Sequence, residues 1–386
     1  MTPKERTLAT LAHQPTDMVP VHHISFSSRV ASALLGREAY VGGGMQQWRE
    51  AVAHWKGPDA HTEFLERSYR DAIEVGIAAG NDILRPSYWR YDCKPTRRLD
   101  ENTFLYEYGP EEDWRVLRFD PDSEQCNIAD YEPRPPTTFE STEREVAAME
   151  QSAADYAPSE SDFAFELRAK RELGDSYEIR VGGVGVGLPL REIQIWLEAL
   201  LLRPDLVERY LDVQVEMARR NVEFLAPLGF RHFWGGLDFA SNEGPMYSPR
   251  LFQRFVIPRL RAVTEICHRH GAYHFFASDG DLWSVADMLF GDKAVDGYYE
   301  IDGRAGMDLR RLREKYPVLI LIGNISSHTV HLGPKAAIVE ETLRALEVAK
   351  SEGGVVVGVS NQFVSGTPIE NVMTALETIR ENRRLP

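Results

Sequence analysis

Eight short apolar segments, each followed by a stretch with helical spacing, are the feature that most constrains the fold of this 386-residue chain. Most of them lack polar–apolar alternation, which is typical of parallel strands buried on both faces. This order predicts an α/β fold, a single (β/α)8 barrel over residues 1–386. A doubly wound sheet is the alternative, but no GxGxxG sequence follows the first strand. The predicted strands are Val19–Ile24, Asp82–Pro86, Ile179–Gly185, His232–Leu237, Ala272–Ala277, Gly297–Ile301, Val318–Ile322 and Gly354–Val359.

The strand–helix order is interrupted after the second strand. We expect residues 90–178 to form an insertion that includes a β-hairpin. Covering one mouth of the barrel and forming an oligomer contact, such as a homodimer interface, are both open roles for this segment. In the hairpin, Phe104, Tyr106 and Tyr108 are expected to face Trp114, Val116 and Leu117 across a Gly-Pro turn.

Charge and composition exclude several classes of partner. The formal net charge of −15, with no compensating basic block, argues against binding to nucleic acid or to an anionic membrane. No apolar run approaches the roughly 20 residues of a membrane span, and the charged N-terminal stretch has no signal-peptide pattern. The three isolated cysteines form neither a disulfide framework nor a CxxC motif. We therefore expect a cytoplasmic protein that acts on a small molecule.

The segment Trp234–Pro258 is typical of an active-site segment in a barrel of this kind. An apolar strand ends at Asp238, a Gly/Asn/Ser loop follows, and Ser248-Pro249 is suited to begin a helix. Active sites of α/β barrels are built at the carboxyl ends of the strands. Asp238 is therefore a candidate catalytic residue.

The other predicted strand ends are rich in carboxylates and amides and poor in lysine and arginine. Asp279 and Asp281, which follow the fifth strand, join Asp238 as candidate catalytic residues. An ordinary turn is the alternative, with Asp281 capping the next helix, and Asp302 could likewise be a loop residue. His274 lies near the start of its strand, so we expect a structural role for it. The candidate substrate-binding residues are His22, His23, Trp89, Arg191, Trp234, Tyr298, Glu300, Asp302, Asn324 and Asn361.

Several motifs, in order along nearly the whole chain, resemble those of the uroporphyrinogen decarboxylase superfamily. They are PKERTLATLAHQPTDMVPV, GGLDFASNEGPMYSP, FASDGDL, EIDGRAGMDLRRLREKY, LILIGNIS and SGTPIEN. The resemblance implies a barrel enzyme. It also implies two known activities, tetrapyrrole decarboxylation and methyl transfer, whose required residues can be sought in this chain.

The chain lacks residues that each of these two activities requires. The decarboxylase motif Met-Arg-Gln-Ala-Gly-Arg, whose arginines bind the substrate carboxylates, is replaced by HHISFSSRVASALLG, and the final family histidine aligns with Asn361. The zinc ligands of the thiol-activating methyltransferases align with Ala277, Asp279 and Asn361. Neither thiolate nor imidazole remains, so we expect no zinc there and assign no metal ligand, although oxygen ligands could still hold a harder cation.

The resemblance therefore leaves the less characterised members of the superfamily. The first hypothesis is transfer of a methyl group from a small methylated donor to a corrinoid (cobalamin), either free or on a partner protein. One of the three candidate aspartates would supply a proton. Alternatively, the carboxylates with Trp89, Trp234, Tyr298 and Tyr299 would hold a cationic or aromatic donor. The second hypothesis is a lyase acting on a small acid, with Arg191 binding its carboxylate. The third is a barrel that binds a tetrapyrrole or corrinoid without turnover.

Overall fold

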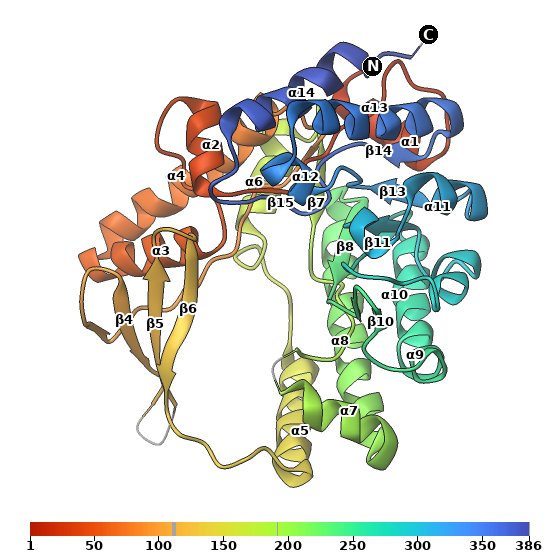
Figure 1. Ribbon diagram of the computed structural model, residues 1–386. Coiled ribbons are helices and arrows are strands. Elements are labelled where there is room, and N and C mark those ends of the chain that lie inside the picture. The colour runs from red at the N-terminus through yellow and green to blue at the C-terminus, as the bar shows by residue number, and fades with distance from the viewer. Residues whose placement is uncertain (110–112, 191, 386) are drawn as a thin grey trace.

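A seven-stranded parallel sheet forms the centre of the computed structural model, which describes residues 1–109, 113–190 and 192–385 (Figure 1). The strands occur in the order β14-β13-β12-β11-β8-β7-β2, so neighbours in the sheet are successive parallel strands of the predicted series. Their bounds are β2 (Ile83–Leu84), β7 (Glu178–Val181), β8 (His232–Gly236), β11 (Tyr273–Ala277), β12 (Gly297–Tyr299), β13 (Ile320–Ile322) and β14 (Val355–Val356).

The first predicted strand lies between the two edges of this sheet as an extended segment. The carbonyl of Val21 accepts a hydrogen bond from Asp82 N at 2.7 Å, and His22 N donates to the carbonyl of Val357 at 2.9 Å. Pro20 has no amide to donate, which limits the length of a regular ladder here. Just beyond, β1 (Ser25–Phe26) pairs in parallel with β15 (Gln362–Phe363). The prediction of a barrel-like parallel α/β fold is confirmed in this form.

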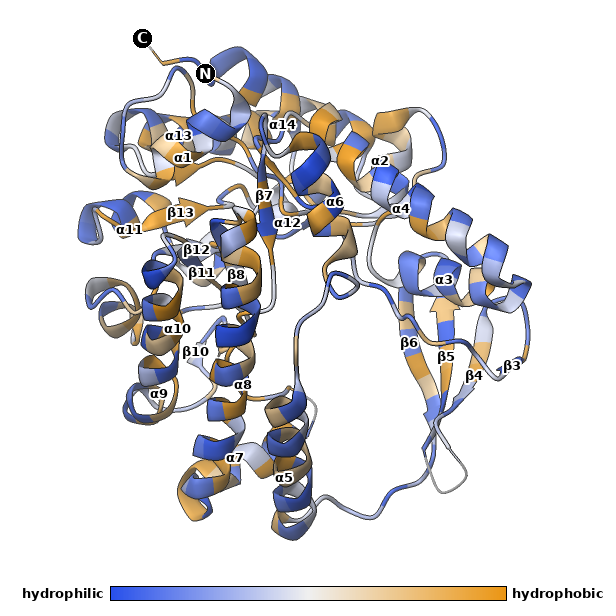
Figure 2. Cartoon of the chain, turned by 180° about the vertical axis from the view of Figure 1, so that it is seen from behind, coloured by the Kyte–Doolittle hydropathy of each residue, from blue (hydrophilic) through white to orange (hydrophobic). Residues whose placement is uncertain are grey.

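Amphipathic helices cover the outside of the curled sheet, and in Figure 2 they are striped in hydrophilic and hydrophobic colours. Among the described residues, no helix combines the length and the apolar character needed to cross a membrane. The α-helices are α1 (Pro3–Leu11), α2 (Ser28–Leu35), α3 (Gly44–Lys56), α4 (Pro58–Ala78), α5 (Phe139–Asp155), α6 (Ala164–Leu173), α7 (Ile193–Leu202), α8 (Pro204–Leu225), α9 (Pro249–Phe255), α10 (Ile257–Arg269), α11 (Leu309–Lys315), α12 (Ser327–Leu332), α13 (Lys335–Glu352) and α14 (Ile369–Asn382).

The core has two layers, one inside the sheet and one between the sheet and the helices. Successive strand residues alternate between the layers. Phe275 and Tyr299 belong to the inner cluster, whereas their neighbours Phe276 and Tyr298 belong to the outer one. Arg180 lies opposite His232 in the register of β7 and β8, so its side chain is on the inner side. We call the space bounded by these inner side chains the lumen.

A separate four-stranded antiparallel sheet follows β2 in sequence. It consists of β3 (Arg97–Arg98), β4 (Thr103–Glu107), β5 (Trp114–Asp120) and β6 (Gln125–Tyr131). Phe104 pairs with Leu117 in the β4–β5 ladder, and Trp48 of α3 stacks on Phe119 at 5.0 Å. Further along the chain, α5 packs against α8, and a bidentate ion pair joins Arg209 to Glu150. The segment 90–178 thus holds more regular structure than one hairpin, and residues 110–112 of the predicted turn lie outside the described residues.

Candidate active site

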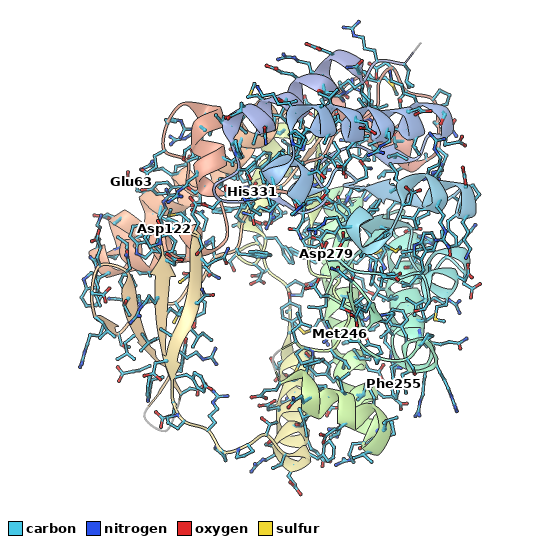
Figure 3. The ribbon with its side chains drawn as sticks, in the orientation of Figure 1. Glu63, Asp122, Met246, Phe255, Asp279 and His331 are labelled. Carbon is cyan, nitrogen blue, oxygen red and sulfur yellow. The ribbon has the colours of Figure 1, made fainter. Side chains whose placement is uncertain are left out.

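Three carboxylates meet at the carboxyl ends of neighbouring strands. Asp238 follows β8, Asp279 follows β11 and Glu300 follows β12, and each places an oxygen within 4.8 Å of the others. Asn361 Nδ2 donates a hydrogen bond to Asp279 Oδ2 at 2.8 Å. Asp279, labelled in Figure 3, and Glu300 are half-buried, whereas Asp238 is exposed. We call these three residues the carboxylate trio.

The backbone around the trio is held in a close, partly strained arrangement. A Cβ on Gly236 would lie 2.0 Å from the carbonyl oxygen of Ala277, so only glycine lets β8 approach β11 here. Glu300 has a φ of 66°, a left-handed conformation that non-glycine residues rarely adopt. Such strain persists where the surrounding structure fixes it, and it is concentrated at functional sites. Downstream, Ser248 caps α9 by accepting from Leu251 N, as the sequence predicted.

The trio retains a proton at neutral pH. Burial, and then the charge of Asp279, raise the pKa of Glu300 to about 8 against the opposing effect of Arg180. Burial and the charge of Asp238 raise the pKa of Asp279 to about 6, although the hydrogen bond from Asn361 lowers it. Like charges this close disfavour full ionisation of the group. Glu300 is therefore a protonated acid at pH 7, beside carboxylates that can ionise.

Two arginines, Arg180 and Arg85, reach the lumen. The prediction that the mouth of the barrel is poor in arginine did not include them. Arg180 of β7 is 2% exposed, and none of its three guanidinium nitrogens has a hydrogen-bond partner among the described residues. Its guanidinium carbon lies 4.5 Å from the ring centre of Trp234. Arg85, after β2, donates through Nε to the carbonyl of Ser87 at 2.7 Å and stacks on Tyr88. Within the described part of the chain, no salt bridge joins either guanidinium to a carboxylate.

Burial weakens the preference of both arginines for a proton, and the charge of Arg180 adds to this effect at Arg85. Burial lowers the pKa of Arg180, and burial together with Arg180 lowers the pKa of Arg85 to about 10. Both remain cationic at neutral pH, because a guanidinium holds its proton throughout this range. Arg180 was not predicted because it lies within its strand, whereas Arg85 was not predicted although it falls at the end of the second predicted strand. Alternation along Glu178–Val181 could have identified Arg180, since it falls on the opposite face from Ile179.

The lumen histidines are neutral. Burial and the charge of Arg180 hold the pKa of His22 and of His232 well below the usual range. The Nδ1–H of His22 donates to the carbonyl of Ile83 at 2.9 Å, and His232 Nε2 pairs with the Tyr299 hydroxyl at 2.7 Å. His23 instead packs against Phe363 in the outer layer. The structure thus brings His22, but not His23, to the lumen.

Several other residues that were predicted from the sequence form hydrogen bonds or packing contacts with their own surroundings. Asp281 accepts from Trp283 N at 2.8 Å, and Asp302 accepts from Arg304 N at 3.0 Å, which are the turn and cap roles weighed as alternatives. His274 is fully buried and paired with Thr264, in agreement with a structural role. Tyr298 packs against Phe290 in the outer layer and donates to the carbonyl of Ser278.

The remaining candidates are scattered. Trp89 is 64% exposed, and Asn324 donates weakly to the carbonyl of Val356 at 3.4 Å. Trp234 is half-buried beside Arg180. Arg191 lies outside the described residues. The functional roles of all these side chains stay predictions.

The trio could hold a cation only through oxygen atoms. Carboxylate oxygens suit hard cations such as Mg²⁺ or Ca²⁺, whereas zinc sites prefer thiolate and imidazole. Asn361 directs its NH₂ group, not its oxygen, at Asp279. This donor set agrees with the sequence-based expectation that the zinc chemistry of the thiol-activating relatives is absent, and that expectation stays a prediction.

Comparisons with known proteins give the family. The family model described as Uroporphyrinogen decarboxylase (URO-D) matches residues 186–382, which is 197 of 386 residues and includes the whole trio. A uroporphyrinogen decarboxylase of Anaeromyxobacter sp. (strain Fw109-5) is 28% identical over 153 residues, which are 39% of each chain. The match therefore spans well under half of that relative.

The fold is similar over nearly the full length to that of a solved structure. A methyltransferase from Methanosarcina mazei superposes with a TM-score of 0.64 at 18% sequence identity, covering 99% of both chains. At this identity the similarity speaks for the fold alone. Together with the motifs and the family match over half of the sequence, it leads to one conclusion: the chain belongs to the uroporphyrinogen decarboxylase family.

Proposed function

We propose that this protein is a barrel enzyme that transfers a methyl group from a small donor to a corrinoid, with the carboxylate trio protonating the leaving group. The observation that carries the proposal is the protonated Glu300 beside Asp279, at the carboxyl ends of the strands. A general acid is most useful when its pKa lies near the working pH, and a value of about 8 meets this condition.

The residues of the chain act on the donor. As the bond between the methyl carbon and the donor oxygen or nitrogen breaks, Glu300 gives its proton to that atom, which leaves as a hydroxyl or amine. Asp279 and the exposed Asp238 then return a proton from solvent to Glu300, which resets the site. When bound, a reduced corrinoid supplies the cobalt nucleophile that accepts the methyl group.

The corrinoid fits this site better as a second substrate than as a resident group. His22 and His23 at the first strand end are 0% and 1% exposed, so neither imidazole is presented to a cobalt ion at the surface. We therefore propose that the corrinoid arrives free or on a partner protein.

The two lumen arginines suggest the chemical class of the donor. Burying a guanidinium without a partner is costly, and an anionic ligand removes the cost by forming charge-assisted hydrogen bonds. None of the guanidinium nitrogens of Arg180 has a hydrogen-bond partner among the described residues, and Arg85 lies close enough for the charge of Arg180 to lower its pKa. Trp234 and Tyr299 add aromatic surface beside Arg180. A methylated aromatic acid combines the required carboxylate and ring.

The test is methyl transfer to reduced cob(I)alamin by the purified protein. We expect consumption of cob(I)alamin with 4-methoxybenzoate or a related methoxylated acid, and far less with methoxybenzene, which lacks the carboxylate. Glu300→Gln, which cannot give up a proton, should bind the donor but turn it over slowly. Absence of reaction with every methoxylated acid and methylamine tried would refute the proposal.

A second candidate function is decarboxylation of a small acid. The observation that favours it is the same Arg180, unpaired among the described residues, which would take the place expected for Arg191 as the cation that this reaction requires. Glu300 would protonate the carbon from which carbon dioxide leaves. Release of carbon dioxide from a small acid in the absence of any corrinoid would favour this function over methyl transfer.

A further inference from the structure

A second cluster of potential ligands lies at the corner between α3 and α4. Glu50 and His54 are one turn apart on α3, His61 is in the first turn of α4, and Asp92 comes from the segment after β2. Each offers one ligand atom within 4.8 Å of the other three. In Figure 1, α3 and α4 lie well away from β11, and Figure 3 shows Asp279 on the barrel side. This cluster is therefore separate from the trio.

The two imidazoles both point their Nε2 atoms at Asp92, and that of His61 also contacts Glu50. The rings of His54 and His61 stack with centres 3.7 Å apart and planes inclined by 24°. Asp92 Oδ1 lies 3.0 Å from His54 Nε2 and 3.7 Å from His61 Nε2. His61 Nε2 is also 3.0 Å from Glu50 Oε1. Two nitrogens and two oxygens thus converge on one small volume.

The charge around the cluster favours a cation. Arg90 contacts Glu50 Oε1 through Nε at 2.9 Å and Asp92 Oδ2 through Nη2 at 3.3 Å. Two carboxylates and one guanidinium leave one negative charge when the imidazoles are neutral. Tyr91 N donates to Glu50 Oε2 at 2.9 Å, so Glu50 is oriented by outer partners as ligating carboxylates commonly are.

The four residues of the cluster also differ in their exposure to solvent. Glu50 is fully buried, whereas the side chain of Asp92 is 63% exposed. A cation could therefore reach the cluster from solvent through Asp92 and be held on its inner side by Glu50. A buried carboxylate beside two imidazoles also gains from a divalent charge, because pairing offsets the cost of its burial.

We infer that His54, His61, Asp92 and Glu50 bind one divalent cation of the zinc class. Imidazole ligands favour Zn²⁺ and its transition-metal neighbours over Mg²⁺ or Ca²⁺, and four protein ligands form a closed, structural type of site. The cation joins the α3–α4 corner to residues 90–93, the segment that leads into the antiparallel sheet. It takes no part in the reaction of the trio, so this inference is independent of the proposed function.

The experiment uses the full chain after treatment with a chelator. Titration with CoCl₂ should give the visible absorption bands of four-coordinate cobalt, which reach a plateau at one equivalent and are displaced by ZnCl₂. His54→Ala and His61→Ala should each abolish these bands. His328→Ala, the same change at an exposed histidine of α12, should keep them.

Two further measurements keep the test decisive. If the histidine variants fail to fold, the exposed Asp92→Asn should still fold and lose stoichiometric binding. Zinc at one equivalent should also raise the melting temperature of the wild-type chain but not of this variant. Featureless cobalt spectra, or binding that survives both His54→Ala and Asp92→Asn, would overturn the inference and leave a histidine–carboxylate salt-bridge network.

Discussion

Replacing Glu300 with glutamine should stabilise the fold in a pH-dependent manner. The folded state holds the pKa of Glu300 at about 8, against 4.5 in the unfolded chain. Between these values the folded carboxyl keeps a proton that the unfolded one has lost, so wild-type stability falls as pH rises. Glutamine is neutral in both states and removes this loss. The difference amounts to about 1 kcal/mol at pH 5 and about 4 kcal/mol at pH 8, at 1.36 kcal/mol for each pKa unit.

The melting temperature provides the assay for this difference. A 386-residue chain has an unfolding entropy of about 0.8 kcal/mol/K, so Glu300→Gln should melt about 1 °C above wild type at pH 5 and about 5 °C above it at pH 8. Glu381→Gln, on the exposed end of α14, should show no such trend. A difference for Glu300→Gln that stays constant from pH 5 to 8 would refute the reasoning, because it would mean that burial does not hold this carboxyl protonated.

Three further predictions follow from the same geometry. Arg180→Met should raise the melting temperature by about 1–4 °C, because it removes a buried charge that has no partner among the described residues. The same change should raise the KM for a carboxylated donor about 10–100-fold, and an unchanged KM would show that Arg180 does not bind the substrate. Turnover should fall as pH rises above about 8, where Glu300 loses its proton, and a rate that keeps rising there would exclude Glu300 as the acid. Gly236→Ala should cost at least about 2 kcal/mol, seen as a melting temperature lower by about 3 °C, because its Cβ would collide with the Ala277 carbonyl; normal stability would show that β8 can shift.

Strand order and strand ends were predictable from the sequence because they depend on local patterns. Buried parallel strands are continuous apolar runs, and Asp238 and Asp279 each follow such a run directly. That these two carboxylates would meet follows from the topology, since the carboxyl ends of parallel strands lie at one edge. The hydrogen bond between Asn361 and Asp279 joins the end of the eighth predicted strand to the end of the fifth, and it requires the sheet to curl. From the sequence, only the proximity of these two residues could be expected, not the bond itself.

Other features depend on the direction of side chains, which the sequence pattern does not determine. Tyr298 and Tyr299 are adjacent and chemically equal, and only the register of β12 decides that Tyr299 faces the lumen. A shift by one residue would exchange them. The α3–α4 cluster was also missed, because its ligands come from three segments separated by an irregular stretch. The spacing of Glu50 and His54 gave a partial signal, as residues four apart share a helix face.

In the proposed reaction, the distribution of charge around the lumen favours one orientation of the donor. The cations come from β7 and the end of β2, whereas the carboxylates follow β8, β11 and β12. A donor with an anionic end therefore gains by directing that end toward Arg180 and Arg85, and its other end then faces Glu300. If the donor were reversed, its carboxylate would meet Asp279 and Asp238, and the resulting repulsion would raise the pKa of the whole group. We therefore expect the donor to bind in the orientation that directs its carboxylate to the arginines and leaves Glu300 free to give its proton to the leaving atom, as a proton-assisted transfer requires.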